Sequence, residues 1–157
     1  MEQSATKGTE LKAEDLFHLG VVTDDLASTK AEFTQLFGYE WGPEVGGEVA
    51  VTLPTGDQVV DLLCAFSITE PRIELVRSAP APLWESVPGI HHLGYWSDDV
   101  DADRDEFAGQ GYSTEATRQA PDGSLFFAFM RSPSGLLLEF VTRVVEPSMS
   151  QCWAAPQ

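Results

Sequence analysis

Residues 17–25 read FHLGVVTDD, and residues 91–99 repeat this stretch as HHLGYWSDD. Five positions are identical at one constant offset: His18, Leu19, Gly20, Asp24 and Asp25 match His92, Leu93, Gly94, Asp98 and Asp99. A self-match at a fixed period is the signature of a repeated structural unit. Because the period is long and there are only two copies, the sequence predicts a duplicated module and not a solenoid.

The composition limits the class of protein. A chain of 157 residues with 43% hydrophobic content suffices for one domain, or for two half-sized modules that share a core. No apolar run reaches the length of a membrane span, and the polar N-terminus does not resemble a signal peptide. Two cysteines are too few for a disulfide framework, so we expect a cytoplasmic protein. The net charge of −16 argues against nucleic acid and anionic membranes as partners, and it mildly disfavours a highly anionic small-molecule substrate.

Each copy of the repeat is predicted to fold as a β-α-β-β-β module. In the first copy we expect a strand over 15–23, a helix that Asp24 or Asp25 caps and Gly38 ends, and strands over 48–53, 58–68 and 72–77. The apolar residues of this helix, Leu26, Phe33, Leu36 and Phe37, are expected on one face. In the second copy we expect a strand over 91–97, a helix over 100–109 capped by Asp98, and strands over 112–119, 125–131 and 136–143.

The two modules are expected to occupy residues 15–78 and 90–145. Residues 1–14 are predicted to be a disordered leader, and residues 146–157 a tail without regular structure. Between the modules, residues 79–89 hold three prolines and are predicted to form an extended linker that Trp84 anchors. Together the modules predict an α+β domain whose curled sheets surround a central site.

The repeated strand places one histidine of each module on the same kind of face. Side chains alternate along a strand, so His18 shares a face with Gly20, and His92 shares one with Gly94. The helix that follows each strand should cover the opposite face. Each histidine is therefore expected on the concave side, which glycine keeps open, whereas His91 has the opposite parity and is assigned no ligand role.

The last strand of each module contains one carboxylate among apolar neighbours, Glu74 in RIELV and Glu139 in LLLEFV. A lone strand histidine or glutamate is usually structural, and an unpaired carboxylate is costly to bury. All four residues occupy matched positions of the repeat, so we expect His18, Glu74, His92 and Glu139 to converge on a pseudo-twofold axis. Such a set of nitrogen and oxygen donors suits a divalent metal and leaves two positions of an octahedral ion open.

These motifs resemble the vicinal oxygen chelate superfamily, which includes glyoxalase I, methylmalonyl-CoA epimerase, extradiol dioxygenases and drug-resistance proteins. The resemblance covers about residues 15–145 and rests on the two HLG strands, the DD pairs, and SPSG leading into LLLEFV. It implies that His18, Glu74, His92 and Glu139 bind one divalent ion, namely Ni, Co, Zn, Mn, Mg or Fe. It also implies a homodimer.

The stretch GIHHLGYWSDDVD most resembles methylmalonyl-CoA epimerase. That resemblance implies that Asp61, in VVDLL, acts as a base, with Glu139 as a second base that loosens its bond to the metal. The predicted reaction removes a proton α to a carbonyl through a metal-stabilised enediolate, as in an isomerase, an epimerase or a glyoxalase-like lyase. Two alternatives stay open. An Fe(II)-dependent dioxygenase needs only two histidines and one carboxylate, and a drug-sequestering resistance protein need not hold a metal.

The side chains expected near the site suggest a weakly charged substrate. Aromatic residues are plentiful there, although several are expected in the core: Trp41, Phe66, Trp84, Tyr95, Trp96, Phe127 and Phe129. Basic residues are few: Arg72, Arg77, Arg118 and Arg131. We therefore expect a partly aromatic or polyketide-like molecule.

Overall fold

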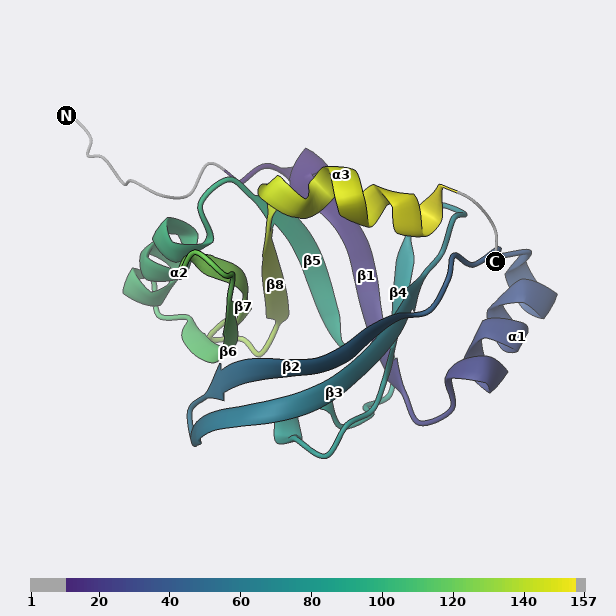
Figure 1. The fold of residues 1–157 in the computed structure, drawn as a ribbon, viewed down its shortest axis with the longest axis horizontal. Coiled ribbons are helices and arrows are strands. Elements are labelled where there is room, and N and C mark those ends of the chain that lie inside the picture. Colours follow the sequence, from purple (N-terminus) through teal and green to yellow (C-terminus); the bar gives the residue numbers. More distant parts are fainter. Residues whose placement is uncertain (1–10, 155–157) are drawn as a thin grey trace.

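The computed structural model describes residues 11–154 and contains two β-α-β-β-β modules (Figure 1). The first comprises β1 (Leu16–Thr23), α1 (Leu26–Phe37), β2 (Val45–Leu53), β3 (Gly56–Phe66) and β4 (Ile73–Arg77). The second comprises β5 (His92–Ser97), α2 (Val100–Gly109), β6 (Ser113–Gln119), β7 (Leu125–Arg131) and β8 (Leu137–Thr142). The predicted α+β class and the order of elements are confirmed.

The eight strands form one closed barrel in the order β1-β4-β3-β2-β6-β7-β8-β5. In each module the first strand pairs in parallel with the last, β1 with β4 and β5 with β8. The modules join where β1 pairs antiparallel with β5, and again where Thr52 of β2 pairs with Thr117 of β6. The curled sheets of the two modules are therefore continuous around a common interior.

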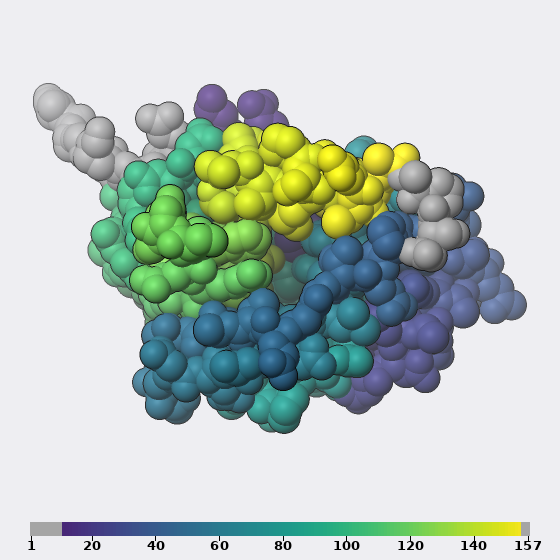
Figure 2. Space-filling view, viewed as in Figure 1, coloured from purple at the N-terminus to yellow at the C-terminus, as the bar shows by residue number. Residues whose placement is uncertain are grey.

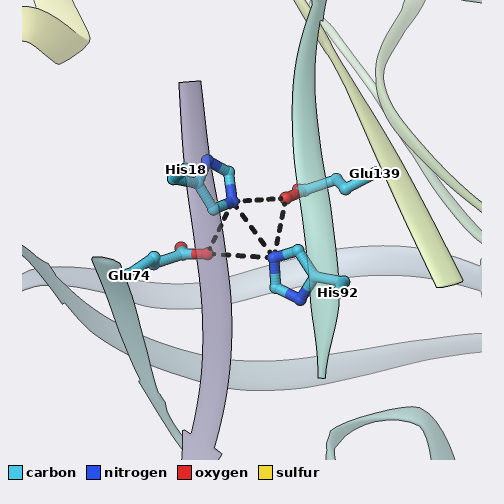
Figure 3. Close-up of side chains that lie close together, drawn as sticks. All are labelled: His18, Glu74, His92 and Glu139. Carbon is cyan, nitrogen blue, oxygen red and sulfur yellow. Dashed lines mark hydrogen bonds and ion pairs between the residues drawn. The ribbon is translucent and has the colours of Figure 1, made fainter. Parts of the chain in front are cut away.

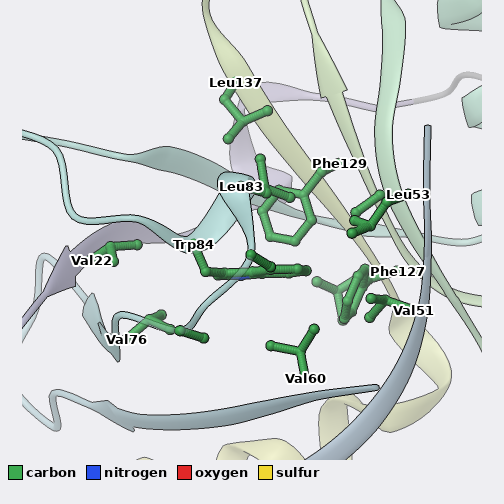
Figure 4. Close-up of a cluster of buried hydrophobic side chains, with 14 of the residues drawn as sticks. Val22, Val51, Leu53, Val60, Val76, Leu83, Trp84, Phe127, Phe129 and Leu137 are labelled. Atoms are coloured by element: carbon green, nitrogen blue, oxygen red, sulfur yellow. The ribbon is translucent and has the colours of Figure 1, made fainter. Parts of the chain in front are cut away.

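The interior is packed with apolar side chains from both modules (Figure 4). The linker forms a short 3-10 turn, η2 (Pro82–Trp84), which inserts Trp84 into this core. Trp84 is 2% exposed and packs edge-on against Phe129, with ring centroids 5.8 Å apart, so the predicted anchor is confirmed. Two smaller clusters lie outside the barrel, where α1 places Leu26 against β3 and β4, and α2 places Val100 against β7 and β8.

The helices differ from the sequence prediction in two respects. The cap of α2 is Asp99 and not Asp98, because Asp99 accepts a hydrogen bond from the Ala102 amide, while Asp98 pairs with Arg143 at 2.7 Å. Asp99 is the repeat equivalent of Asp25, which caps α1.

The expected single apolar face of α1 is also wrong. Leu36 is 63% exposed and Phe37 is 66% exposed, whereas Leu26 is buried. Among the strands, α1 packs chiefly on β4, so its C-terminal turn lies beyond the surface that the helix covers.

In the tail predicted to lack structure, residues 146–153 instead fold as α3 (Glu146–Met149) and η4 (Ser150–Trp153), directly after η3 (Arg143–Val145), while residues 155–157 lie outside the described chain. This segment lies across one side of the barrel (yellow in Figure 1), and Met149 and Trp153 pack against the core. At the other end, η1 (Ala13–Asp15) forms within the predicted leader, whose residues 1–10 lie outside the described chain. No helix within residues 11–154 is long and apolar enough to cross a membrane.

Candidate metal centre

Four side chains converge inside the barrel, one from each of β1, β4, β5 and β8 (Figure 3). The Nε2 atom of His18 lies 3.1 Å from Glu74 Oε1 and 3.3 Å from Glu139 Oε1. The Nε2 atom of His92 lies 3.2 Å from the same two oxygens, and the two Nε2 atoms are 3.1 Å apart. The two histidine side chains are 1% exposed, so the donors face one another away from bulk water.

Glycine in each module makes room for the histidine of the other module. His18 lies opposite Gly94 in the pairing of β1 with β5, and His92 lies opposite Gly20. A Cβ atom added at Gly94 would lie 2.1 Å from His18 Cε1, and one added at Gly20 would lie 2.1 Å from His92 Cε1. Contacts this short cannot form, so a side chain at either position would collide with the histidine ring. The glycine of each HLG strand therefore leaves the space that the imidazole of the other module occupies.

The surroundings of the four residues follow the same internal symmetry. Phe66 is paired in register with Glu74, and Phe129 is paired with Glu139. Phe66 packs edge-on against His18 at 5.5 Å, and Phe129 packs edge-on against His92 at 5.1 Å. Each module therefore supplies a histidine, a glutamate and a phenylalanine that holds its histidine ring.

The donor set fits a divalent metal ion. All four ligand atoms lie within 4.8 Å of one another, and Figure 3 shows the two carboxylates on opposite sides of the imidazole pair. Ligand bonds of ~2.1 Å at right angles place neighbouring donors roughly 3.0 Å apart, close to the separations of 3.1 to 3.3 Å between nitrogen and oxygen here. The chemistry of two imidazoles and two carboxylates suits Zn, Mn, Fe, Co and Ni.

Without a metal, the cluster is held together by shared protons. Burial lowers the pKa of His92, but hydrogen bonds to Glu139 and Glu74 outweigh burial and raise that pKa to about 9. The pKa of His18 is also raised, since the neighbouring carboxylates outweigh the effect of burial. Burial raises the pKa of Glu74, yet the charge of His18 and the two imidazole hydrogen bonds lower it far more. A metal must therefore displace protons from the histidines.

His91 supports His92 from behind. The Nε2 atom of His91 lies 2.6 Å from the Leu83 carbonyl oxygen, and its Nδ1 atom lies 2.8 Å from Nδ1 of His92. Because a carbonyl only accepts, His91 must carry its proton on Nε2, which leaves its Nδ1 as an acceptor. His92 then donates through Nδ1, and once its Nε2 proton is displaced, the lone pair of Nε2 points toward the cluster. His91 lies outside the four-residue cluster, as its parity predicts, but its hydrogen bond favours the tautomer in which His92 could bind a metal.

The cluster opens into a cavity of about 370 Å³. Figure 2 shows the hollow between the C-terminal segment, the β2–β3 hairpin and β6–β7. Its walls are mainly apolar: Val45, Val49, Leu62, Val76, Phe126, Phe127, Val141 and Met149 line it together with the cluster. A volume of this order suits a small organic molecule.

Asp61 does not reach this cavity. Strand β3 turns Leu62, Cys64 and Phe66 toward the interior, so Asp61 lies on the outer face, where its side chain is 59% exposed and pairs with Arg77 at 3.0 Å. This placement does not support the role of base predicted for Asp61. Within the described residues, Glu74 and Glu139 are the carboxylates that line the cavity.

Other expectations about the cavity walls are met only in part. Of the seven aromatic residues expected nearby, Phe66, Phe127 and Phe129 line the cavity, while Trp41 and Tyr95 pack outside the barrel. Of the four arginines, Arg118 lines it. Prediction from the sequence missed Cys64, Phe126 and the C-terminal Met149 and Cys152. Cys64 shares parity with Phe66, so the alternation along β3 held a signal for it, whereas the C-terminal residues gave none.

Comparisons with known structures place this geometry among related folds. Methylmalonyl-CoA epimerase from Mycobacterium tuberculosis matches with a TM-score of 0.53 and 19% identity, over 95% of this chain and 96% of the epimerase chain. A methylmalonyl-CoA epimerase in complex with methylmalonyl-CoA and NH4+ matches with a TM-score of 0.53 and 19% identity, over 82% and 93%. A hypothetical protein from Bacillus halodurans C-125 matches with a TM-score of 0.52 and 22% identity, over 82% and 93%.

At these identities the structural matches show the fold alone. No curated protein matches the sequence at a significant level. The profile of one protein family, however, matches residues 17–129, a span that runs from the first HLG strand through β7 and includes three of the four cluster residues. The chain belongs to the Glyoxalase/Bleomycin resistance protein/Dioxygenase superfamily.

Proposed function

We propose that this protein is a metal-dependent isomerase or lyase that moves a proton α to a carbonyl group of a small organic substrate. The observation that carries the proposal is the buried cluster of His18, Glu74, His92 and Glu139 at the wall of an apolar cavity. A divalent ion bound by these residues would stabilise negative charge that develops on the carbonyl oxygen when the α-proton leaves. The apolar walls exclude water and so strengthen the electrostatic interactions inside.

Glu139 is the residue that we assign as the proton acceptor. Both carboxylates contact the two histidines, and burial together with Glu74 raises the pKa of the Cys64 thiol. A base must be near the proton that it removes, and both carboxylates line the cavity that would hold the substrate. The proton that Glu139 takes up then returns from the same carboxyl group to the substrate, as an isomerisation requires.

The alternatives fit the residues less well. An Fe(II)-dependent dioxygenase uses two histidines and one carboxylate, and here a second carboxylate contacts the same two histidines. A sequestering protein need not hold a metal, so it has no use for a buried set of four metal-ligand side chains at the wall of its binding cavity. The related folds include enzymes that bind methylmalonyl-CoA, but a coenzyme A ester carries phosphates, and one arginine lines this cavity.

The test is exchange of the substrate α-proton with solvent deuterium. Metal-loaded protein is incubated in D₂O with α-hydroxyketones and 2-substituted acyl thioesters, and exchange is followed by proton NMR. Glu139→Gln keeps an oxygen donor for the metal but not a base, so exchange should fall by ~10²–10⁴-fold while bound metal, measured by elemental analysis, stays near one ion per chain.

The same assay separates the two assignments of the base. Asp61→Asn should exchange at the rate of the wild type, because Asp61 lies outside the cavity. If Asp61→Asn lost exchange and Glu139→Gln kept it, the prediction from the sequence would be restored. A wild-type protein that binds metal and ligands without exchange would favour the sequestering alternative.

A further inference from the structure

Arg118 differs from every other arginine of the chain. The other five form ion pairs within residues 11–154: Arg72 with Glu70, Arg77 with Asp61, Arg104 with Asp105, Arg131 with Glu115, and Arg143 with Asp15 and Asp98. Arg118 pairs with no carboxylate in that part of the chain. In a protein with 25 acidic and nine basic side chains, an arginine without a carboxylate is unexpected.

The side chain of Arg118 is held at the cavity wall and not released to solvent. Its guanidinium lies 4.5 Å from the ring centroid of Phe126, a cation–π contact that fixes the plane of the group. Burial at the wall lowers the pKa of Arg118, and no carboxylate within the described residues pairs with the guanidinium to offset it. A guanidinium in this state presents unused N–H donors to whatever enters the cavity.

Arg118 and the metal centre stand at separate points of one wall. In the register of the barrel, Arg118 pairs with Phe127 and Glu139 pairs with Phe129. From Arg118 to Glu139 the sheet is crossed by two strand spacings, β6 to β7 and β7 to β8, and followed for two residues along a strand. This separation puts the two Cα atoms roughly 12 Å apart. The walls between them are apolar, and Arg118 is the sole lysine or arginine, within the described residues, that lines the cavity.

We propose that Arg118 binds a carboxylate at one end of the substrate while the oxygens at the other end reach the metal centre. This inference rests on the proposed function for the identity of the reacting end, and it names the substrate class: an apolar carbonyl compound that ends in a monocarboxylate. The planar guanidinium matches a carboxylate with two parallel hydrogen bonds. One arginine balances one negative charge, and the net charge of −16 on the chain disfavours a polyphosphate.

The test uses matched ligands that differ at one end. Hydroxamic acids chelate a metal through two oxygens, so alkyl hydroxamic acids of increasing length, ending in a carboxylate, a carboxamide or a phosphonate, are titrated into the metal-loaded protein by calorimetry. At the best length the carboxylate should bind about tenfold or more tightly than the carboxamide, as expected for a charge-assisted hydrogen bond. Hexanoate and hexanamide, titrated into metal-free protein, examine the same preference without the ion.

Two variants test whether the preference for the carboxylate over the carboxamide comes from Arg118. Arg118→Met keeps an apolar contact with Phe126 and should bind both ligands with the carboxamide affinity. Arg131→Met is the matched control, because Arg131 lies on the neighbouring strand, pairs with Glu115 and does not line this cavity, so it should keep the preference. Equal affinities in the wild type, or a preference that survives Arg118→Met, would overturn the proposal, and tighter binding of the phosphonate would reassign the site to a phosphate ester.

The binding test of Arg118 and the proton-exchange test of the proposed function can fail separately. A protein that discriminates the carboxylate but fails to exchange an α-proton keeps the Arg118 site and loses the proposed reaction. A protein that exchanges the proton but binds the carboxylate and the carboxamide equally keeps the proposed reaction and loses the Arg118 site.

Discussion

Replacing His91 should weaken metal binding although His91 is not a ligand. In the metal-bound protein His92 must carry its proton on Nδ1, and the acceptor for this proton is Nδ1 of His91 at 2.8 Å. The His92 side chain is 1% exposed, so no bulk water replaces a lost acceptor. A buried donor without a partner costs about 1–3 kcal/mol. Above pH 9 metal-free His92 is neutral and can avoid this cost by carrying its one proton on Nε2, so there the cost falls on the metal-bound state.

The free energy converts to a loss of metal affinity of roughly 5–150-fold, in line with the 10–100-fold that residues behind metal ligands usually contribute. His91→Phe keeps a ring of similar shape and removes both nitrogens. His91→Gln keeps an acceptor for His92 and a donor for the Leu83 carbonyl, which His91 now contacts at 2.6 Å. We therefore expect weak binding in His91→Phe and near wild-type binding in His91→Gln.

The assay is competition for Zn²⁺ or Ni²⁺ against a chromophoric chelator at fixed pH, with circular dichroism to establish that each variant is folded. Equal metal affinity of His91→Phe and the wild type would refute the tautomer argument. A loss of the same size in His91→Gln would show that packing, and not hydrogen bonding, is what His91 supplies.

Further expectations follow from the same centre. His92→Ala should bind no stoichiometric metal by elemental analysis, and a full equivalent would remove His92 from the ligand set. Metal affinity should rise from pH 6 to about 9, because the pKa of metal-free His92 is about 9 and its proton must leave when metal binds below that pH. Calorimetry in buffers of different ionisation enthalpy should record about one to two protons released on metal binding at pH 7. An affinity that does not change with pH would contradict this expectation. Gly94→Ala should lower metal affinity at least tenfold, since its Cβ would lie 2.1 Å from His18, whereas Gly109→Ala, which has open space, should not. The homodimer stays a prediction that sedimentation velocity tests.

Much of the candidate metal centre could be predicted because its four residues occupy matched positions of a sequence repeat. Two matched strands place His18 and His92 on equivalent faces, and two apolar strands each hold one carboxylate, so strand alternation and internal symmetry were sufficient. Asp61 shows where this reasoning ends. Its parity relative to Glu74 depends on the register of β3 against β4, in which Phe66 pairs with Glu74, and the loop between these strands hides that register.

The remaining differences have the same kind of cause. The C-terminal segment contributes Met149 and Cys152 to the cavity, yet α3 and η4 are each four residues long, too short for any hydrophobic period. Leu36 and Phe37 follow a helical period, but that period reports which residues are apolar and not how far the covering sheet extends. In both cases the burial of the residues depends on contacts with segments distant in the sequence, which local patterns do not report.

The reciprocal fit of glycine and histidine bears on how such a centre can arise. One module contains both halves of the fit, a histidine that needs space and a glycine that provides it two residues later. A single short gene for one module would therefore encode the whole cluster, provided that two identical chains met about a twofold axis. Joining the two copies by the linker that carries Trp84 turns that encounter into an intramolecular one. Once joined, the halves are free to diverge, and the arginine that lines the cavity, Arg118, lies on β6 of the second half.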